Sequence, residues 1–136
     1  MLEELGKLGA LKLVDVVAYH PYTDEPEGDP ATSDPDNFIK RAVHLNTALR
    51  SAGVKNLWAT EFGWSTYKGP KVIQPIINET TQADYFLRRL VLMMTLDYDR
   101  VFWFSLSDLD QRVAERDQFY GMITLDGKPK PIYVAL

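Results

Sequence analysis

Three short apolar runs, each followed by a polar loop and an amphipathic stretch, limit the folds that this chain can adopt. The runs cover residues 13–19, 57–60 and 101–105, and none of them alternates cleanly between apolar and polar side chains. They are rich in β-branched and aromatic residues. Such runs are typical of strands buried on both faces, as in parallel sheets. The pattern therefore predicts a parallel β-sheet.

The segments between the runs predict helices with recognisable ends. Residues 33–35, Ser-Asp-Pro, supply an N-cap and a first-turn proline, and Gly53 ends the first helix. Thr81 and Asp84 resemble a capping box at the start of a second helix. Residues 2–8 resemble the tail of an earlier helix. The apolar stripes of the two main helices are Phe38, Ala42, Leu45 and Leu49 in the first and Phe86, Leu90, Val91 and Met94 in the second.

The order strand, helix, strand, helix, strand is typical of right-handed parallel crossovers. We find no internal repeat, low-complexity tract or linker, so we expect one α/β domain over residues 1–136. A chain of 136 residues buries roughly two thirds of its unfolded surface, which is enough for a hydrophobic core.

Composition excludes several classes of function. Fifteen Lys and Arg against nineteen Asp and Glu give a net charge of -4, which argues against nucleic acid or an anionic membrane as partner. No apolar run approaches the roughly 20 residues of a membrane helix, and the first residues lack the basic start of a signal peptide. Without cysteine there is no disulfide or thiolate chemistry. We expect a soluble globular protein, in a compartment that the sequence leaves open.

We expect neither a metal site nor a cofactor. The chain has two histidines, His20 and His44, and His44 falls inside the first predicted helix. The acidic, proline-rich loop at residues 24–30 is either a solvated loop or a calcium site, although its spacing is not that of an EF-hand.

Polar, ionisable side chains follow all three apolar runs. His20 and Tyr22 follow the first run, Glu61 follows the second, and Ser107 and Asp108 follow the third. In parallel α/β folds the loops after the carboxyl ends of the strands bind substrates. The sequence therefore predicts a site at this edge of the sheet.

Glu61 is the sharpest candidate because it lies among large aromatic and apolar residues, in the heptapeptide WATEFGW at 58–64. A glutamate in such surroundings is rarely buried without a partner. It is either a functional carboxylate, aimed into a cleft by a bend at Gly63, or a structural one bonded to an amide or an arginine. His20 is either structural or, together with Tyr22, a donor that orients a nearby carboxylate.

Aromatic residues near the same edge are candidates for sugar binding, because ring faces pack on the apolar C–H faces of sugars. The alternative for each is packing in the core, and for Trp103 the two interpretations weigh equally. Glycine-rich phosphate loops and serine nucleophile elbows are not found. The candidates for an aromatic rim are Tyr22, Trp64, Tyr67 and Trp103.

Four passages together resemble clan A glycoside hydrolases. Residues 15–22, 58–64 and 102–105, which read DVVAYHPY, WATEFGW and FWFS, resemble strands six, seven and eight of those (β/α)8 barrels. Residues 119–131 are similar to the passage before their last helix, with a turn at Asp126 and Gly127 and a helix opened by Pro131. Family 39, or a neighbouring family of cellulases and xylosidases, is the nearest resemblance, and it spans nearly the whole chain.

The resemblance implies a retaining β-glycosidase that acts on a carbohydrate substrate. Glu61 would be the nucleophile that forms a glycosyl-enzyme. Tyr22 would bond the Glu61 carboxylate, and His20 would support the sugar subsite. Trp103 would form the floor of the subsite at the cleaved sugar, and the remaining candidates for substrate binding are Trp64, Tyr67 and Asp108.

The sequence departs from the family in one respect. Retaining chemistry needs a second carboxylic acid about 5 to 5.5 Å from the nucleophile. In the family this acid/base follows strand four, whereas the resemblance here starts just before strand six. A complete barrel has eight strands and about 250 residues. The resemblance therefore implies the C-terminal part of a barrel, with about three parallel βα units and a last helix cut short at Leu136.

A partial barrel leaves unpaired sheet edges and an apolar face, so we expect a homo-oligomer built through them. Assembly would bring Glu61 of one copy near Asp108, Asp110 or Glu115 of another. Two alternatives to an enzyme stay open: a carbohydrate-binding module without turnover, and a structural fragment without its own function.

Overall fold

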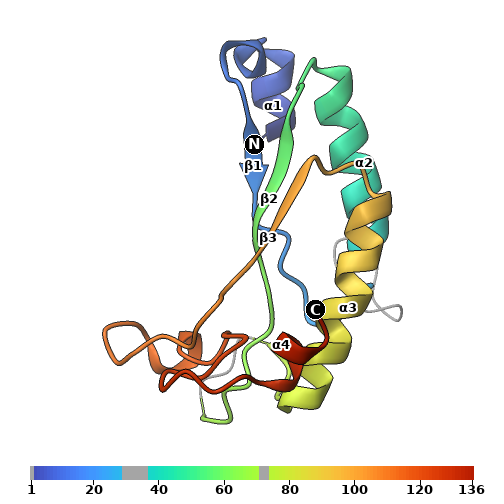
Figure 1. The fold of residues 1–136 in the computed structure, drawn as a ribbon. Helices are drawn as coiled ribbons and strands as arrows, with labels where there is room; N and C mark the ends of the chain where they lie inside the picture. The colour runs from blue at the N-terminus through green and yellow to red at the C-terminus, as the bar shows by residue number, and fades with distance from the viewer. Residues whose placement is uncertain (1, 29–36, 71–73) are drawn as a thin grey trace.

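The chain forms a three-stranded parallel sheet, as the apolar runs predict. The computed structural model describes residues 2–28, 37–70 and 74–136. Strand β2 is central, and each neighbour pairs with it in parallel, with Val17 opposite Leu57 and Trp58 opposite Arg100 (Figure 1). The strands are β1 (Val17–Tyr19), β2 (Leu57–Phe62) and β3 (Arg100–Trp103).

Two long helices connect the strands and cover one face of the sheet (Figure 1). Helix α2 (Phe38–Ser51) joins β1 to β2, and helix α3 (Glu79–Thr95) joins β2 to β3. The result is three parallel βα units arranged as part of a (β/α)8 barrel. Over the described ranges, none of the helices has the length and apolar character needed to cross a bilayer. The shorter elements are α1 (Leu2–Lys7), η1 (Ala10–Leu13), η2 (Glu115–Asp117) and α4 (Pro131–Val134).

Both long helices begin at an asparagine cap that the sequence patterns did not single out. The Asn37 side chain accepts a hydrogen bond from the Lys40 amide at 3.1 Å, whereas the predicted cap at residues 33–35 lies outside the described residues. The Asn78 side chain accepts from the Thr81 amide at 2.8 Å, so the cap predicted at Thr81 is wrong by one turn. Asparagine is among the strongest N-cap residues.

The buried face of α3 is more polar than its predicted stripe. Phe86 is buried, but Val91 and Met94 are 62% and 77% exposed. In their place Gln82 and Arg89 are buried, because their side chains bond to carbonyl groups of the loops above the sheet. A stripe chosen from apolar residues alone misses this face. In α2, by contrast, Phe38, Ala42 and Leu49 are buried as predicted.

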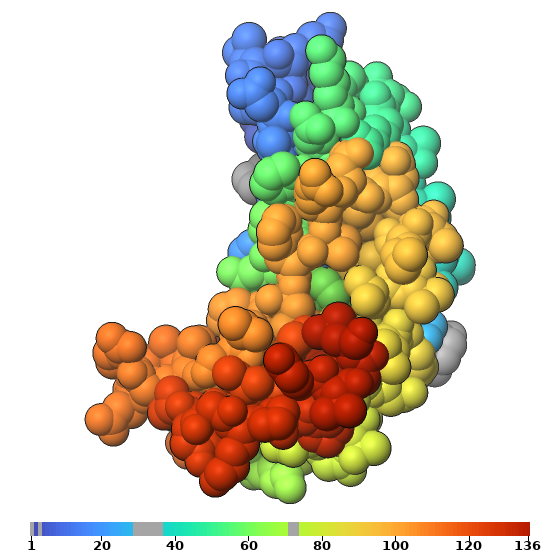
Figure 2. Space-filling view, viewed as in Figure 1, coloured from blue at the N-terminus to red at the C-terminus, as the bar shows by residue number. Residues whose placement is uncertain are grey.

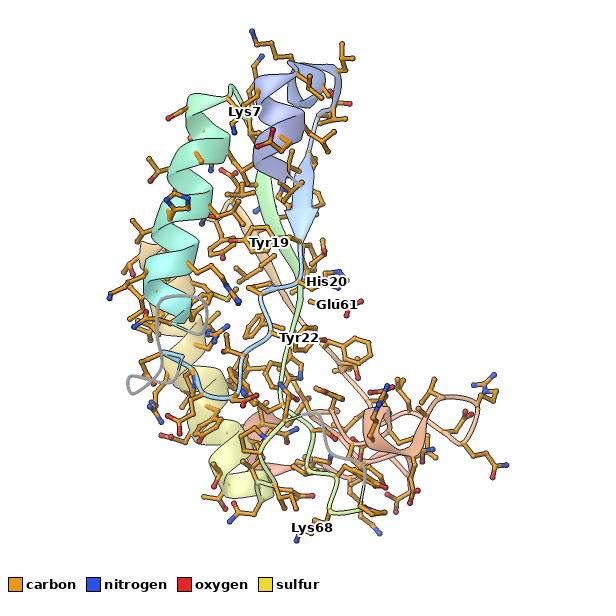
Figure 3. The ribbon with its side chains drawn as sticks, turned by 180° about the vertical axis from the view of Figure 1, so that it is seen from behind. Lys7, Tyr19, His20, Tyr22, Glu61 and Lys68 are labelled. Atoms are coloured by element: carbon orange, nitrogen blue, oxygen red, sulfur yellow. The ribbon has the colours of Figure 1, made fainter. Side chains whose placement is uncertain are left out.

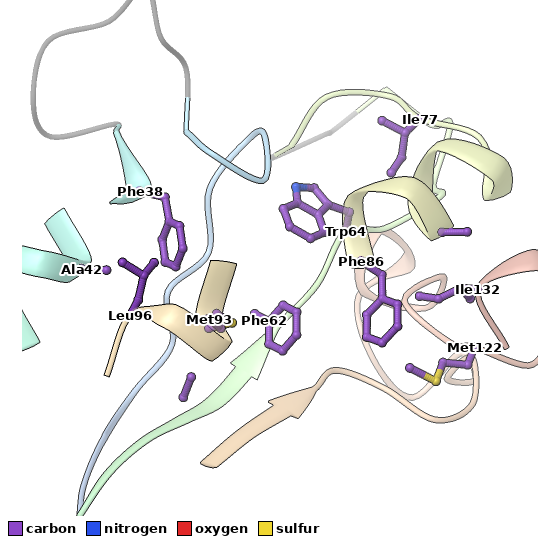
Figure 4. Packing of buried hydrophobic residues seen from close by; sticks show 12 residues of the cluster. Phe38, Ala42, Phe62, Trp64, Ile77, Phe86, Met93, Leu96, Met122 and Ile132 are labelled. Carbon is purple, nitrogen blue, oxygen red and sulfur yellow. The ribbon is translucent and has the colours of Figure 1, made fainter. Parts of the chain in front are cut away.

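The main core lies between the two long helices and the strand ends (Figure 4). Phe62 stacks on Phe86 with ring centroids 6.5 Å apart, and Trp103 meets Phe86 edge to face at 5.1 Å. Such aromatic pairs add to the free energy gained from burial alone. The core reaches Ile132 of α4, which ties the C-terminal segment to α3.

The opposite face of the sheet carries Ala18, Trp58 and Phe102, and no described helix lies over it (Figure 1). Phe102 is 46% exposed, and its ring lies 5.8 Å from that of Trp58. The prediction that the strands are buried on both faces is therefore wrong for this structure. In a closed barrel the corresponding face of the sheet points to the interior.

The segment after β3 projects beyond the sheet and gives the molecule its bent outline (Figure 2). Gly127 has a φ of 85°, as the turn predicted at Asp126 and Gly127 requires, and Pro131 stands in the first turn of α4. This projecting segment supplies one wall of the site described next.

Candidate active site

The three predicted catalytic side chains lie together where β1 and β2 end (Figure 3). Glu61 Oε2 accepts a hydrogen bond from the Tyr22 hydroxyl at 3.2 Å, and His20 Nδ1 lies 3.4 Å from the same oxygen. The side chains of Glu61 and His20 are 37% and 49% exposed, so a ligand can reach both of them.

A shift in strand register turns Glu61 away from the helices. Leu57, Ala59 and Phe62 are buried against the helix layer, a spacing of two residues and then three. The pairing of β2 with β3 is irregular between Ala59 and Phe62. Strict alternation from Leu57 would bury residue 61, whereas the bulge gives the buried place to Phe62. Bulges re-aim side chains in this way beside many active sites.

Gly63 permits a close approach rather than the sharp bend that its position predicts. A Cβ atom at this residue would stand 2.5 Å from the Phe104 carbonyl oxygen. The backbone after β2 therefore packs directly against the backbone after β3, where the Phe104 amide donates to the Phe62 carbonyl at 3.0 Å. This contact brings Phe104 beside Glu61.

A cavity of about 480 Å³ opens in front of Glu61. This volume lies in the range of about 300–1,000 Å³ that is typical of small-molecule sites. One wall comes from the loops after β1 and β2, and the other from the segment after β3. The lining residues are Tyr22, Thr23, Glu61, Gln74, Phe104, Leu109, Val113, Asp117 and Tyr120.

Two phenols of the cavity are held in the protonated state. Burial, with the Glu61 carboxylate next, raises the pKa of Tyr22 far above its ordinary value. Burial and then Asp117 raise the pKa of Tyr120 to about 12. The two rings meet edge to face, with centroids 6.2 Å apart. Both hydroxyls are hydrogen-bond donors at neutral pH.

At the end of β3, the aromatic side chain that faces the cavity is Phe104 and not Trp103. The Trp103 ring packs against Phe62 and Phe86, and its indole N–H donates to the Tyr120 carbonyl at 3.2 Å. Successive residues of an extended chain point to opposite sides. In this structure the partly buried Trp103 ring packs against the core, and its role in substrate binding stays a prediction.

Trp64 and Tyr67 are buried and line no part of the cavity. Trp64 is 1% exposed, and its indole N–H donates to the Thr23 carbonyl at 2.9 Å, which fixes the loop after β1. Tyr67 stacks on Phe119, and its hydroxyl donates to Glu115 at 3.3 Å. Both rings pack between loops in this structure, and their roles in sugar binding stay predictions.

Asp108 also has a structural position. It is 8% exposed, accepts from the Gly121 amide at 2.8 Å, and pairs with the Lys130 ammonium at 2.6 Å. A Cβ atom at Gly121 would stand 2.1 Å from the Asp108 amide nitrogen, so only glycine fits there. The pair ties the segment after β3 to the residue before α4.

Arg89 of α3 fixes the loop that carries Tyr22. The fully buried guanidinium donates to the carbonyls of Pro21 at 2.8 Å and Pro26 at 2.7 Å, and to the Thr23 hydroxyl. It also lies over the Phe38 ring at 3.5 Å. Burial lowers the pKa of Arg89 to about 9, which leaves it charged at neutral pH. Arg89 thus fixes the chain both before Tyr22, at Pro21, and after it, at Thr23 and Pro26.

Of the nine lining residues, the sequence patterns predicted Tyr22 and Glu61 and missed the others, among them Gln74, Phe104, Asp117 and Tyr120. The position of Phe104 next to Trp103 in a strand was the one available signal. In the described part of the chain, no group of three or more His, Asp or Glu side chains is placed to hold a metal ion.

Comparison with known proteins finds similarity at the level of structure. No family model and no curated protein sequence matches the chain. The family 39 glycoside hydrolase of Bacteroides cellulosilyticus WH2 is similar at a TM-score of 0.75 and 20% identity, over 96% of this chain and 27% of that one. A β-galacturonidase of family 2 from Eisenbergiella tayi, bound to glycerol, has a TM-score of 0.66 at 18% identity, over 92% and 23%.

The Ruminococcus gnavus β-glucuronidase in complex with D-glucuronic acid has a TM-score of 0.61 at 16% identity, over 90% of this chain and 22% of that one. The chain thus spans between a fifth and somewhat over a quarter of the length of these enzymes. Its three parallel βα units have the fold of part of a (β/α)8 barrel, arranged as in glycoside hydrolases.

Proposed function

We propose that the chain carries the nucleophile side of a retaining β-glycosidase site, with Glu61 as the nucleophile. The observation that carries this proposal is the placement of the Glu61 carboxylate, held by Tyr22 and beside His20, at the mouth of a cavity. Likeness in fold to glycoside hydrolases, two of them named for uronic-acid substrates, supports a carbohydrate as the ligand.

The proposed reaction has two steps. In the first, a Glu61 oxygen attacks the anomeric carbon, the bond to the leaving oxygen breaks, and that oxygen takes up a proton. In the second, water attacks the same carbon, loses a proton, and releases the Glu61 carboxylate. Tyr22 donates to Oε2 throughout, which leaves the other oxygen, Oε1, as the attacking atom. His20 assists at the sugar.

The proton of the first step needs a second carboxylic acid. Apart from Glu61, the described carboxylate that lines the cavity is Asp117. Loss of a general acid typically slows such a reaction by about 10²- to 10⁴-fold. Aryl glycosides with good leaving groups need little protonation, so they are the substrates on which Glu61 is best tested.

The test compares hydrolysis of a panel of aryl β-glycosides by the wild-type chain, Glu61→Gln and Glu4→Gln. Glu4 pairs with Lys7 at the far end of the molecule, so its variant controls for the loss of one charge. Turnover that is lost in Glu61→Gln and kept in Glu4→Gln supports the proposal. Equal rates in both variants overturn it.

A second candidate is sugar binding without turnover. It is favoured by the same cavity, whose partly exposed Phe104 ring offers a sugar contact that needs no acid catalyst. Under this candidate no variant hydrolyses the glycosides, and Glu61→Gln weakens sugar affinity only modestly. Unchanged melting temperature with every sugar at millimolar concentration would contradict both candidates.

We further propose that the chain self-associates through the sheet face that carries Trp58 and Phe102. Exposed aromatic rings and unpaired strand edges favour contact with a second copy. The test is the mass by light scattering at micromolar concentration, for wild type, Phe102→Asp and Val91→Asp. Val91 is an even more exposed apolar residue, on α3. A dimer that Phe102→Asp alone dissociates supports the proposal, and a monomeric wild type overturns it.

A further inference from the structure

We infer that the cavity selects neutral glycosides over glycosides of uronic acids, and that Asp117 determines this choice. The inference rests on the proposed function, because it takes the cavity to bind a sugar. It separates this chain from the solved glucuronidase and galacturonidase that share its fold.

The charged groups that line the cavity are both negative. Glu61 and Asp117 line it with side chains 37% and 36% exposed. None of the lining residues that the structure describes is a lysine, an arginine or a histidine. A ligand carboxylate in this space would face these two like charges, and none of the described lining residues is a cation that could pair with it.

Three basic side chains near the cavity, Arg89, Arg116 and His20, are not among its lining residues. Arg89 points its donors at the carbonyls of Pro21 and Pro26, behind Tyr22. Arg116 Nε lies 3.8 Å from Asp117, which is beyond a hydrogen bond, and Arg116 is not among the lining residues. His20 lies beside Glu61 and carries a charge only when it is protonated.

The neutral donors of the cavity wall are already engaged. The Tyr22 hydroxyl donates to Glu61 at 3.2 Å, and the Tyr120 hydroxyl donates to Gln74 Oε1 at 2.7 Å. The Gln74 amide donates to the Gly63 carbonyl at 2.9 Å, and the Thr23 hydroxyl donates to the Glu25 carbonyl at 2.6 Å. A uronate carboxylate, which only accepts hydrogen bonds, would compete with these acceptors for donors.

The carboxylates, by contrast, have acceptor capacity to spare. Each carboxylate accepts up to about four hydrogen bonds. Hydroxyl groups of a neutral sugar donate to such oxygens, and the aromatic walls take its C–H face. After burial, Asp117 raises the pKa of Tyr120, Arg116 lowers it and Glu61 raises it, so the two carboxylates act on this phenol against one guanidinium.

The experiment uses two pairs of ligands that differ only at C6. Methyl β-D-glucoside and methyl β-D-glucuronide form one pair, and the corresponding galactoside and galacturonide form the other. Dissociation constants are measured by NMR titration at pH 8, in low salt and in about 0.5 M NaCl. The variants are Asp117→Asn and, as a control with the same change in net charge, Glu4→Gln.

In low salt the wild type and Glu4→Gln should bind the neutral glycoside of each pair about tenfold more tightly than the uronide. The reason is that two partly exposed carboxylates repel the carboxylate of the uronide. Asp117→Asn should reduce this preference severalfold, chiefly by tighter uronide binding. High salt should also reduce this preference in the wild type, and that test does not depend on the folding of any variant.

Uronides bound as tightly as their neutral partners would overturn the inference and leave the proposed function standing. A preference that neither Asp117→Asn nor salt reduces would also overturn it. If no sugar binds to any variant, the proposed function fails, and this inference fails with it.

Discussion

Tyr22 and Glu61 stand 39 positions apart in the sequence, yet the Tyr22 hydroxyl donates to the Glu61 carboxylate at 3.2 Å. Two features of the fold produce this contact. Parallel pairing of β1 with β2 brings the ends of the two strands to the same edge. The bulge in β2 then turns Glu61 to the side of the sheet that faces away from the helices.

Tyr22→Phe should lower kcat on aryl β-glycosides by ~10²-fold, because the Glu61 carboxylate loses the donor that orients it. The free energy of unfolding should fall by only about 1 kcal/mol, the net value of one hydrogen bond. Steady-state kinetics and urea unfolding measure the two effects. A variant that keeps the wild-type kcat would show that the Tyr22 hydroxyl does not position Glu61.

The elements of the fold could be predicted from the sequence because each has a local signal. Apolar runs predict the three strands, and Gly53, Gly127 and Pro131 mark turns or helix ends that the structure confirms. The caps at Asn37 and Asn78 were missed because serine, threonine and aspartate lay close by and satisfy the same rule.

The cavity was harder to predict, because its walls depend on contacts between distant segments. Trp103 and Phe104 are aromatic residues adjacent in the sequence. The side of the sheet on which the helices lie decides which of the two faces the cavity. Asp117 ends the three-residue helix η2 and Tyr120 follows it, and an element this short has no periodicity to predict it. Asp108 was predicted to bind substrate because it follows the third apolar run. Its partner, Lys130, lies 22 positions later, and no local pattern connects the two residues.

Tyr120 should make the protein less stable at alkaline pH. Its pKa is raised from 10.0 to about 12 in the folded state, so between these values the unfolded chain releases a proton that the folded chain retains. Stability from this group is complete below pH 10 and is lost as the pH rises toward 12. Arg89, with a pKa lowered to about 9, contributes with the opposite sign.

Comparison of variants isolates the contribution of Tyr120. Between pH 9 and pH 12 the wild type should lose about 1 to 2 kcal/mol more stability than Tyr120→Phe, because only the wild type carries the titrating phenol. Urea unfolding at several pH values measures the two slopes. Parallel slopes for wild type and Tyr120→Phe would contradict the prediction, since Arg89 is the same in both.

Asp108→Asn should destabilise the fold rather than remove a sugar contact. The Asp108–Lys130 pair is almost fully buried, and loss of one charge leaves the other without its partner. Breaking such a pair costs about 3–5 kcal/mol. Asp126→Asn, which breaks the exposed pair with Lys128, should have a far smaller effect on stability, because water screens that pair. A stable Asp108→Asn variant with weakened sugar binding would instead favour the role predicted from the sequence.

Arg89→Met should destabilise the protein by about 3–5 kcal/mol, because several carbonyl groups of the loop after β1 lose their donor in a buried site. Arg88→Met is the matched control, since Arg88 is the next residue of α3 and makes exposed pairs with Glu27 and Asp84. That variant should lose about 1 kcal/mol or less. Urea unfolding compares the two.

Arg89→Lys separates the charge of Arg89 from its shape. A lysine keeps the positive charge, but its three donors leave from one atom and cannot reach Pro21 and Pro26 together as the guanidinium does. Arg89→Lys should therefore lose most of the stability that Arg89→Met loses. Full stability in Arg89→Lys would mean that the charge over the Phe38 ring, and not the set of hydrogen bonds, holds the loop that carries Tyr22.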